Sequence, residues 1–407
     1  MNVLSIASNN ELCCGCNACI SSCPENAIVL KKKASGQLRP IIDEEKCIDC
    51  SLCTKVCCIL NNVPKRMPIK TMAASYKNTE LSCKSSSGGI FAAIAENIIS
   101  KGGIVYGTAF DKEYSAVVVG IESIDELSAI QGSKYVKSQM GNVYSAIEMN
   151  LKSGRKVLFS GVPCQVAALK QYLRKHYDNL ITIDIVCHGT PSNKIFQDYI
   201  DFIQRKKKIK ILDFVFRDKA VGQDTIGKVK YKQDHFGKVK YKQERLYAYK
   251  SSYYKLFLNC ALFEENCYSC KFACPERVGD VSLGDFWGIE KTYPSFVDKV
   301  VKNGLCGISA VMINTECGAK EIENINENLL LHPVFYDEIR KYNPQLNHPS
   351  KKTVENNTIL QLYSSYGYKA VDDYYHKKYR ARIVINTIWN CIPRKIQKII
   401  LRLIKKG

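Results

Sequence analysis

Alternating apolar and polar stretches divide the middle of the chain into strands and helices. Continuous apolar runs predict buried strands over 104–106, 116–121, 156–160 and 180–186. Apolar residues at helical spacing predict helices over 90–100, 163–173 and 192–205. Because strand, turn and helix recur in this order, the pattern predicts βαβ units within a mixed α/β domain.

A seven-residue sequence occurs twice in a later, β-rich stretch. GKVKYKQ stands at 227–233 and again at 237–243, with Val and Tyr alternating with Lys. Alternation with a period of two predicts two half-buried strands joined as a hairpin. Two copies at so short a period do not indicate a solenoid, so we interpret them as a local duplication.

Cysteines near the amino terminus form two runs with the same spacing. Each run contains C-x2-C-x2-C-x3-C, the ligand spacing of bacterial ferredoxins that hold two clusters. Three thiolates on one tight loop reach one cluster, whereas the fourth lies on the next helical turn and reaches the other. This rule predicts one [4Fe–4S] cluster on Cys13, Cys16, Cys19 and Cys57, and a second on Cys47, Cys50, Cys53 and Cys23.

Structural zinc is the alternative for these sulfur atoms, because zinc ribbons also use C-x2-C pairs. A ribbon needs two separated pairs, whereas each run here offers a triplet and a trailing cysteine, so iron–sulfur clusters are favoured. Cys14 and Cys58 are additional thiols beside the predicted ligands, and packing is the role expected for both. Each is adjacent to a predicted ligand, so a shift of the assignment by one position stays open.

Cysteine is the unusual component of an otherwise ordinary composition. The 407-residue chain is 46% hydrophobic and 24% charged, as in soluble globular proteins, yet it has 20 cysteines. Its first residues lack the basic start and apolar core of a signal peptide, and no apolar stretch approaches the ~20 residues of a membrane-spanning helix. We therefore expect a cytoplasmic protein whose thiols stay reduced and bind metal rather than form disulfides.

The formal net charge of +20 is concentrated at the carboxyl terminus. Ten Lys and Arg and no acidic residue lie between Lys377 and Lys406. The apolar residues that share one helical face there are Ile396, Ile399, Ile400, Leu403 and Ile404. Such a helix fits an anionic membrane surface at the inner membrane face, and a helix docked on its own domain is the equal alternative. Nucleic-acid binding is not expected, because no recognisable module for it is present.

Cysteines in the second half of the chain form a further candidate metal site. Cys164 begins a predicted helix, where the helix dipole is expected to acidify its thiol. Cys187 and His188 follow a predicted strand, at the sheet edge where α/β proteins place ligands. The remaining candidates are Cys267, Cys270 and Cys274. Four cysteines from three loops suit a third cluster or another metal, and unreactive buried thiols are the alternative.

Seven short motifs follow one another between residues 75 and 290. They are SSGGIF at 86–91, VYG at 105–107, QGSKYV at 131–136, FSGVPCQV at 159–166, DIVCHGTPS at 184–192, CYSCK at 267–271 and GDVSLGDFWG at 279–288. In these motifs the chain resembles the coenzyme F-420 hydrogenase/dehydrogenase beta-subunit family. The basic tail is not part of the resemblance.

The resemblance implies a flavin-containing iron–sulfur oxidoreductase that binds FAD, with FMN as the alternative. It implies a third [4Fe–4S] cluster on Cys164, Cys187, Cys267 and Cys270, with Cys274 as a substitute ligand. The flavin would convert between the single electrons of the clusters and the electron pair of a hydride. The cofactor-binding residues expected on this basis are Ser87, Gly88, Gly89, Gly132, Ser133, Lys134, Tyr135, Gly161 and Gln165.

His188 and Lys134 are the candidate catalytic residues. His188 is placed to protonate a substrate or to steady a reduced flavin, and a hydrogen-bonded packing role is equally compatible with its position. Lys134 is placed to supply a cation to a phosphate or to the reduced flavin, and a solvated loop lysine is the even alternative.

The sequence therefore predicts an α+β protein in three parts. These are a two-cluster ferredoxin-like module over 1–63, a mixed α/β flavin and iron–sulfur domain over 73–335, and a helical region with the basic tail over 336–407. We expect an enzyme that passes electrons between its clusters and a flavin, which exchanges hydride with a small-molecule substrate or a deazaflavin coenzyme. Surface polysaccharide biosynthesis is one setting that the resemblance allows. The alternative is a non-catalytic electron-transfer subunit that docks on a partner protein, the donor or acceptor of its electrons.

Overall fold

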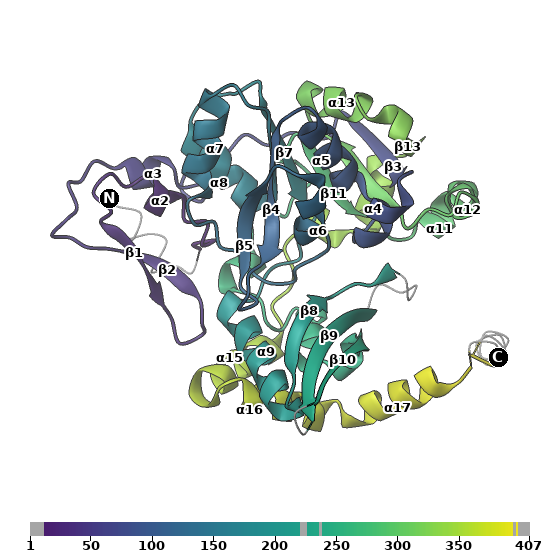
Figure 1. Cartoon of the computed structure of the whole chain (residues 1–407). Helices are drawn as coiled ribbons and strands as arrows, with labels where there is room; N and C mark the ends of the chain where they lie inside the picture. Colours follow the sequence, from purple (N-terminus) through teal and green to yellow (C-terminus); the bar gives the residue numbers. More distant parts are fainter. Residues whose placement is uncertain (1–11, 220–225, 236–237, 394–395, 398–407) are drawn as a thin grey trace.

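An eight-stranded mixed sheet forms the centre of the molecule (Figure 1). The computed structural model describes residues 12–219, 226–235, 238–393 and 396–397. The strand order is β13-β3-β12-β11-β7-β6-β4-β5. The strands are β3 (Lys70–Tyr76), β4 (Ile104–Phe110), β5 (Ala116–Ile121), β6 (Val157–Gly161), β7 (Leu180–Ile185), β11 (Val281–Asp285), β12 (Ser309–Ile313) and β13 (Leu329–Pro333). The run β4, β6, β7 and β11 is parallel, which confirms the predicted βαβ units.

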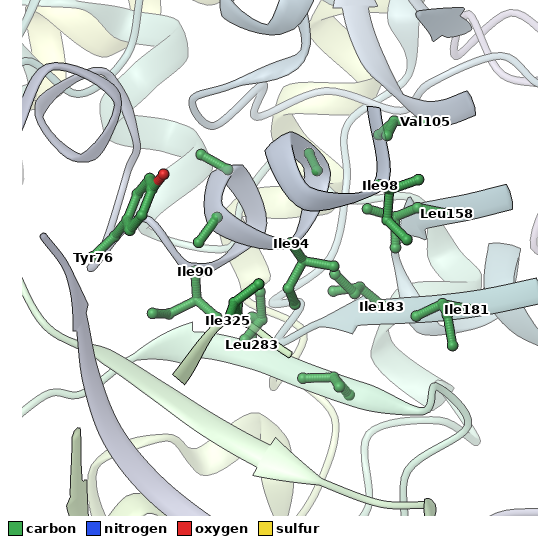
Figure 2. Close-up of a cluster of buried hydrophobic side chains, with 14 of the residues drawn as sticks. Tyr76, Ile90, Ile94, Ile98, Val105, Leu158, Ile181, Ile183, Leu283 and Ile325 are labelled. Atoms are coloured by element: carbon green, nitrogen blue, oxygen red, sulfur yellow. The ribbon is translucent and has the colours of Figure 1, made fainter. Parts of the chain in front are cut away.

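Helices cover both faces of this sheet. On one face Ile90, Ile94 and Ile98 of α5 (Ile90–Ser100) point toward Leu158, Ile183 and other sheet residues, as Figure 2 shows. The same face carries α4 (Thr79–Lys84), α6 (Leu127–Ile130) and α13 (Glu316–Glu323). On the opposite face, β4 and β6 pack against α7 (Val143–Lys152) and α8 (Pro163–Leu173). On that same face, β3 and β12 pack against α11 (Ile289–Thr292), α12 (Pro294–Lys302) and α14 (Tyr336–Tyr342). The sheet is thus buried on both sides, as a parallel sheet requires.

The amino-terminal module lies against the α7 and α8 side of the sheet (Figure 1). It consists of the hairpin β1 (Ile28–Lys32) and β2 (Leu38–Ile42) with the short helices α2 (Ala18–Ser21) and α3 (Leu52–Lys55). Cys14, Cys16 and Cys58 of the module are buried in the same core as Tyr144 of α7 and Val166 of α8. The module therefore shares its interior with the α/β domain.

A second, three-stranded sheet lies beside the main one. It has the order β10-β9-β8, with β8 (Lys210–Val215), β9 (Ile226–His235) and β10 (Lys238–Tyr247). The repeated sequence forms the antiparallel hairpin β9–β10, in which Gln233 faces Lys240, and the predicted hairpin is confirmed. An aromatic core joins this sheet to α9 (Asn193–Lys207), α10 (Ser252–Leu258), α15 (Val354–Tyr366) and α16 (Tyr368–Lys378).

The last described helix, α17 (Arg380–Cys391), extends away from the body of the molecule (Figure 1). Among the described residues, none of the helices has both the length and the apolar composition that a membrane span needs. Of the apolar face predicted for the basic tail, Ile399, Ile400, Leu403 and Ile404 lie outside the described residues, and Ile396 is exposed.

Candidate functional site

The two cysteine runs have the same backbone geometry. In each run the residue after the second cysteine adopts a left-handed conformation, Asn17 with φ 63° and Ser51 with φ 58°, and begins the following short helix. Non-glycine residues rarely adopt this conformation, so its occurrence at both places shows that the runs repeat in structure as well as in sequence. Each loop thereby turns tightly enough to direct three cysteines toward one centre.

The group predicted to hold the second cluster surrounds one cavity. A cavity of about 270 Å³ is lined by Cys23, Cys47, Cys50 and Cys53. Cys50 is exposed and the other three are half-buried, so this group lies at the surface of the molecule. Four sulfur donors around one cavity match the chemistry of a four-iron cluster.

The group predicted to hold the first cluster is more deeply placed. Cys16, Cys19 and Cys57 are buried, and Cys13 packs against Cys19 and Cys57. Burial raises the pKa of Cys19 and of Cys57, and neighbouring cysteines raise both further. Hydrogen bonds from Cys14 and Cys58 lower the pKa of Cys16 to about 5. At Cys19 and Cys57, therefore, positive charge from a bound metal is needed to favour the thiolate.

Cys14 and Cys58 lie between this group and the interior of the α/β domain. Their sulfur atoms are 3.7 Å apart, and with that of Cys16 they lie within 4.8 Å of one another. The Cys58 thiol also lies 3.7 Å from the carbonyl oxygen of Cys164. The two thiols expected to serve packing therefore form the contact between the amino-terminal module and a third group of cysteines.

That third group gathers cysteines from three separate loops. A cavity of about 230 Å³ is lined by Cys164, Cys187, Cys267 and Cys270, together with Cys14. Cys164 is in the first turn of α8, and Cys187 follows β7. Cys267 is in the short 3-10 helix η4 (Glu265–Ser269) after α10, and Cys270 directly follows that helix. Burial raises the pKa of Cys187 to about 12 and that of Cys270 to about 11. The structure thus brings together the four residues that the family resemblance implied.

Two features of these cysteines differ from expectation. The pKa of Cys164 is raised, not lowered, because its hydrogen bond to Cys14 and its burial outweigh the start of the helix. Cys274 contacts Lys65, whose Nζ is 3.2 Å from its sulfur, and it is not among the residues that line the cavity. The position of Cys274 outside the cavity therefore does not support it as a substitute ligand of the third cluster.

Cys83 and Cys306 form a disulfide, although all thiols were expected to be reduced. They come from α4 and from the loop before β12, which are 223 residues apart in sequence and meet beside β3. No spacing signal could have paired them, since only the fold brings these two segments together.

A buried ion pair docks the amino-terminal module onto the loop of the third group. Arg39 of β2 lies 3.2 Å from Glu264, and each side chain is only 4% exposed. Its guanidinium also donates to the side-chain oxygen of Asn266, next to Cys267. Sequence reasoning missed both partners, because an Arg on a strand and a Glu in a loop carry no pairing signal.

The loops predicted to hold the flavin are in contact with each other. The hydroxyls of Ser86 and Ser133 are 2.7 Å apart. Several donors in these loops are already engaged within the protein: Ser87 Oγ donates to Ile308 O, and the Gly88 N–H donates to Ser309 Oγ. Gly88 is needed for packing, because a Cβ there would lie 2.3 Å from the Ala74 carbonyl oxygen. Gly89 and Gly132 have positive φ, and Tyr135 stacks on Phe257.

Gly161 and Gln165 lie apart from those loops. The Gln165 side chain is 1% exposed, donates to Ser138 Oγ at 2.8 Å and accepts from the Val162 N–H. Its amide is thus fully used inside the protein, and a Cβ on Gly161 would touch Gln165 Oε1 at 3.0 Å. These residues fit packing of the β6–α8 turn and do not fit a flavin contact.

The two predicted catalytic residues differ in their placement. His188 lines the cavity of the third group, and its Nδ1 is 3.3 Å from Gln345 Nε2. Burial lowers the pKa of His188, and the nearby Asp285 opposes this shift. Lys134 Nζ instead donates to the carbonyl oxygens of Ala129 and Gln131, at 2.8 and 2.7 Å. The lysines that do line the cavity are Lys137 and Lys271, neither of which was predicted as a site residue.

Comparison with known proteins gives two matches along the chain. Residues 12–59 match the 4Fe-4S dicluster domain, and residues 154–334 match the carboxyl-terminal part of the beta subunit of coenzyme F420 hydrogenase/dehydrogenase. A curated relative is one of the subunits of the F(420)H(2) dehydrogenase of Methanosarcina mazei, 23% identical over 219 residues, which cover 51% of this chain. The chain spans 61% of the length of that relative.

Among solved structures, the chain is similar to one in the F420-reducing [NiFe] hydrogenase complex from Methanosarcina barkeri. The identity is 16% and the TM-score 0.44, with 73% of this chain and 93% of that chain covered. The sequence matches confirm the predicted iron–sulfur electron-transfer class. The chain carries a 4Fe–4S dicluster domain at its amino terminus, and its residues 154–334 match the coenzyme F420 hydrogenase/dehydrogenase beta-subunit family.

Proposed function

We propose that the chain is an electron-transfer subunit of an oxidoreductase and holds three [4Fe–4S] clusters. The observation that carries this proposal is the gathering of twelve cysteines into three neighbouring groups. The ligands are Cys13, Cys16, Cys19 and Cys57 for the first cluster, Cys47, Cys50, Cys53 and Cys23 for the second, and Cys164, Cys187, Cys267 and Cys270 for the third. Such clusters carry single electrons.

The partner protein docks at the second cluster in this proposal. Cys50 is the exposed cysteine of the three groups, and the neighbouring Ile48 is 61% exposed. An exposed ligand places the second cluster at the surface, where a partner protein can approach it closely. The curated relative is itself named as a subunit, which supports a role within a larger assembly.

Anaerobic purification of the full chain tests this function. We expect about twelve irons per chain, as three four-iron clusters require, and reversible bleaching of the visible spectrum by a one-electron reductant. About eight irons would contradict the third cluster, and a colourless or zinc-containing protein would contradict the function as a whole.

We propose flavin-dependent oxidoreductase activity as the second candidate function. The contact between Ser86 and Ser133 favours it, because it joins the two loops in which FAD is expected. FAD would supply the exchange between single electrons and a hydride. The residues that would bind FAD are those predicted in the two loops, without Gly161 and Gln165: Ser87, Gly88, Gly89, Gly132, Ser133, Lys134 and Tyr135. Release of one flavin per iron-loaded chain by acid would support this function, and a flavin-free chain that still accepts electrons would exclude it.

We also propose that α17 attaches the protein to an anionic membrane surface. Val384, Ile385 and Ile388 are 50%, 65% and 60% exposed on one side of the helix. Arg380 and Arg382 flank this apolar face, and no acidic residue follows in the sequence. An apolar face bordered by basic residues is typical of helices that lie at a bilayer interface.

Flotation with vesicles tests the attachment. The full chain is expected to float with vesicles containing phosphatidylglycerol and not with phosphatidylcholine vesicles. The double variant Ile385→Asp/Ile388→Asp should lose binding, whereas Val354→Asp, at a side chain that is 91% exposed on α15, should keep it. Equal binding by all three proteins would exclude α17 as the attachment site, and capture by an acidic protein alone would replace the membrane with that partner.

A further inference from the structure

Lys137 is a buried lysine that lies between the amino-terminal module and the third group of cysteines. It is 9% exposed and lines both the third-group cavity and a neighbouring cavity of about 180 Å³ bordered by Gly15 and Arg39. Its ammonium donates to the carbonyl oxygen of Cys14. Lys137 therefore contacts the module from inside the α/β domain.

The surroundings of Lys137 are rich in groups that become negative. The cavity that Lys137 enters is lined by Cys164 and Cys267, two of the proposed ligands of the third cluster. Glu264 is already paired with Arg39, and within the described part of the chain Lys137 has no ion pair of its own. A buried charge without a partner costs several kcal/mol, so a negative group near Cys164 and Cys267 is expected to balance it.

Cys14 connects Lys137 to the first group. It lies between the ligands Cys13 and Cys16, and its sulfur is within 4.8 Å of that of Cys16. The same residue lines the third-group cavity. Its backbone thus accepts the Lys137 hydrogen bond while its side chain lies beside Cys16 of the first group, so Cys14 connects Lys137 with that group.

We infer that Lys137 is a positioning residue. Its positive charge favours the transfer of an electron from the first cluster to the third across Cys14. The inference rests on the three-cluster function proposed above. The step is the transfer of one electron, in which the first cluster is oxidised and the third is reduced. No bond forms or breaks, and Lys137 keeps its protons. Reduction adds a negative charge beside a fixed positive one, so Lys137 stabilises the reduced state.

A redox titration followed by EPR spectroscopy tests the inference on the iron-loaded full chain. Lys137→Met keeps the length of the side chain and removes its charge. We expect the electron equilibrium between the first and third clusters to shift about tenfold toward the first, which is about 59 mV for a one-electron couple. Lys137→Arg restores a charge at this position and should recover most of the shift.

Lys77→Met is the matched control, because the Lys77 ammonium also donates to a carbonyl oxygen, that of Glu327, and lines neither cavity. It should leave both potentials unchanged. Lys137→Gln provides a second neutral variant if the methionine variant folds poorly. Unchanged potentials in a neutral variant with about twelve irons would overturn the inference and leave the three-cluster function standing. An equal shift in Lys77→Met would also overturn it. A wild-type chain with about eight irons would instead contradict the proposed function.

Discussion

The amino-terminal module and the third group both collect cysteine sulfur atoms, but the chain builds them differently. In the module, six of the eight predicted ligands come from two short loops with the same left-handed turn at Asn17 and Ser51. In the third group, Cys164, Cys187 and the Cys267–Cys270 pair come from three loops that only the sheet brings together. In the module, the spacing of the cysteines along the sequence is thus enough to bring the ligands together. The third site instead depends on the correct fold of the α/β domain.

Substitution of a third-group cysteine is expected to give the largest effect. Cys187→Ser should lower the iron content by about four of about twelve atoms, because each four-iron cluster needs all of its ligands. The EPR signals of the two amino-terminal clusters should persist and show that the chain has folded. Iron analysis of the anaerobic protein measures this loss.

Cys274→Ser provides the control for that experiment, since its sulfur faces Lys65 outside the cavity. It should keep its full iron content. A loss of iron in Cys274→Ser with none in Cys187→Ser would reverse the assignment of the ligands.

Arg39→Met should destabilise the contact between the amino-terminal module and the loop of the third group. Removing the Arg leaves Glu264 buried and unpaired at the loop of the third group, which costs about 3–5 kcal/mol of unfolding free energy. Chemical denaturation of the iron-loaded proteins measures this change. Lys352→Met breaks the partly exposed pair with Glu265, 2.6 Å apart, and should cost less than about 1 kcal/mol. Equal costs for the two variants would mean that Arg39 does not dock the module.

The second and third clusters are expected to lose iron at different rates. The second group includes the exposed Cys50, whereas no cysteine of the third group is exposed. A soluble iron chelator should therefore bleach the second cluster about tenfold faster than the third, since local opening of the buried site costs additional free energy. Time-resolved EPR spectra separate the two losses. Loss of both at one rate would indicate that they share a single opening step.

These regions also differ in how far the sequence alone could predict them. The spacing of the amino-terminal cysteines predicts their grouping directly, because neighbouring residues on a tight loop cannot separate in space. The strands and helices around Cys164 and Cys187 are equally visible in the apolar pattern. Lys137 and the Arg39–Glu264 pair could not be predicted, because their burial depends on how the module packs on α7 and α8. The same holds for the Cys83–Cys306 disulfide.

Tyr144→Phe should give the smallest effect in this series. The Tyr144 hydroxyl donates to the carbonyl oxygen of Cys16 at 2.7 Å, and its ring is fully buried on α7. Loss of the hydroxyl leaves that oxygen without the bond, so we expect a loss of about 1 kcal/mol in the unfolding free energy. Tyr241→Phe, at a side chain that is 74% exposed, should change it by less than about 0.5 kcal/mol.

The central claim is that a third cluster lies next to the first, on Cys164, Cys187, Cys267 and Cys270. The most direct measurement is the EPR spectrum of the fully reduced, iron-loaded chain, compared with that of Cys164→Ser. Three interacting signals are predicted for the wild-type chain, and the variant should keep two of them without the broadening that arises from the third. Identical spectra from the two proteins would contradict the claim.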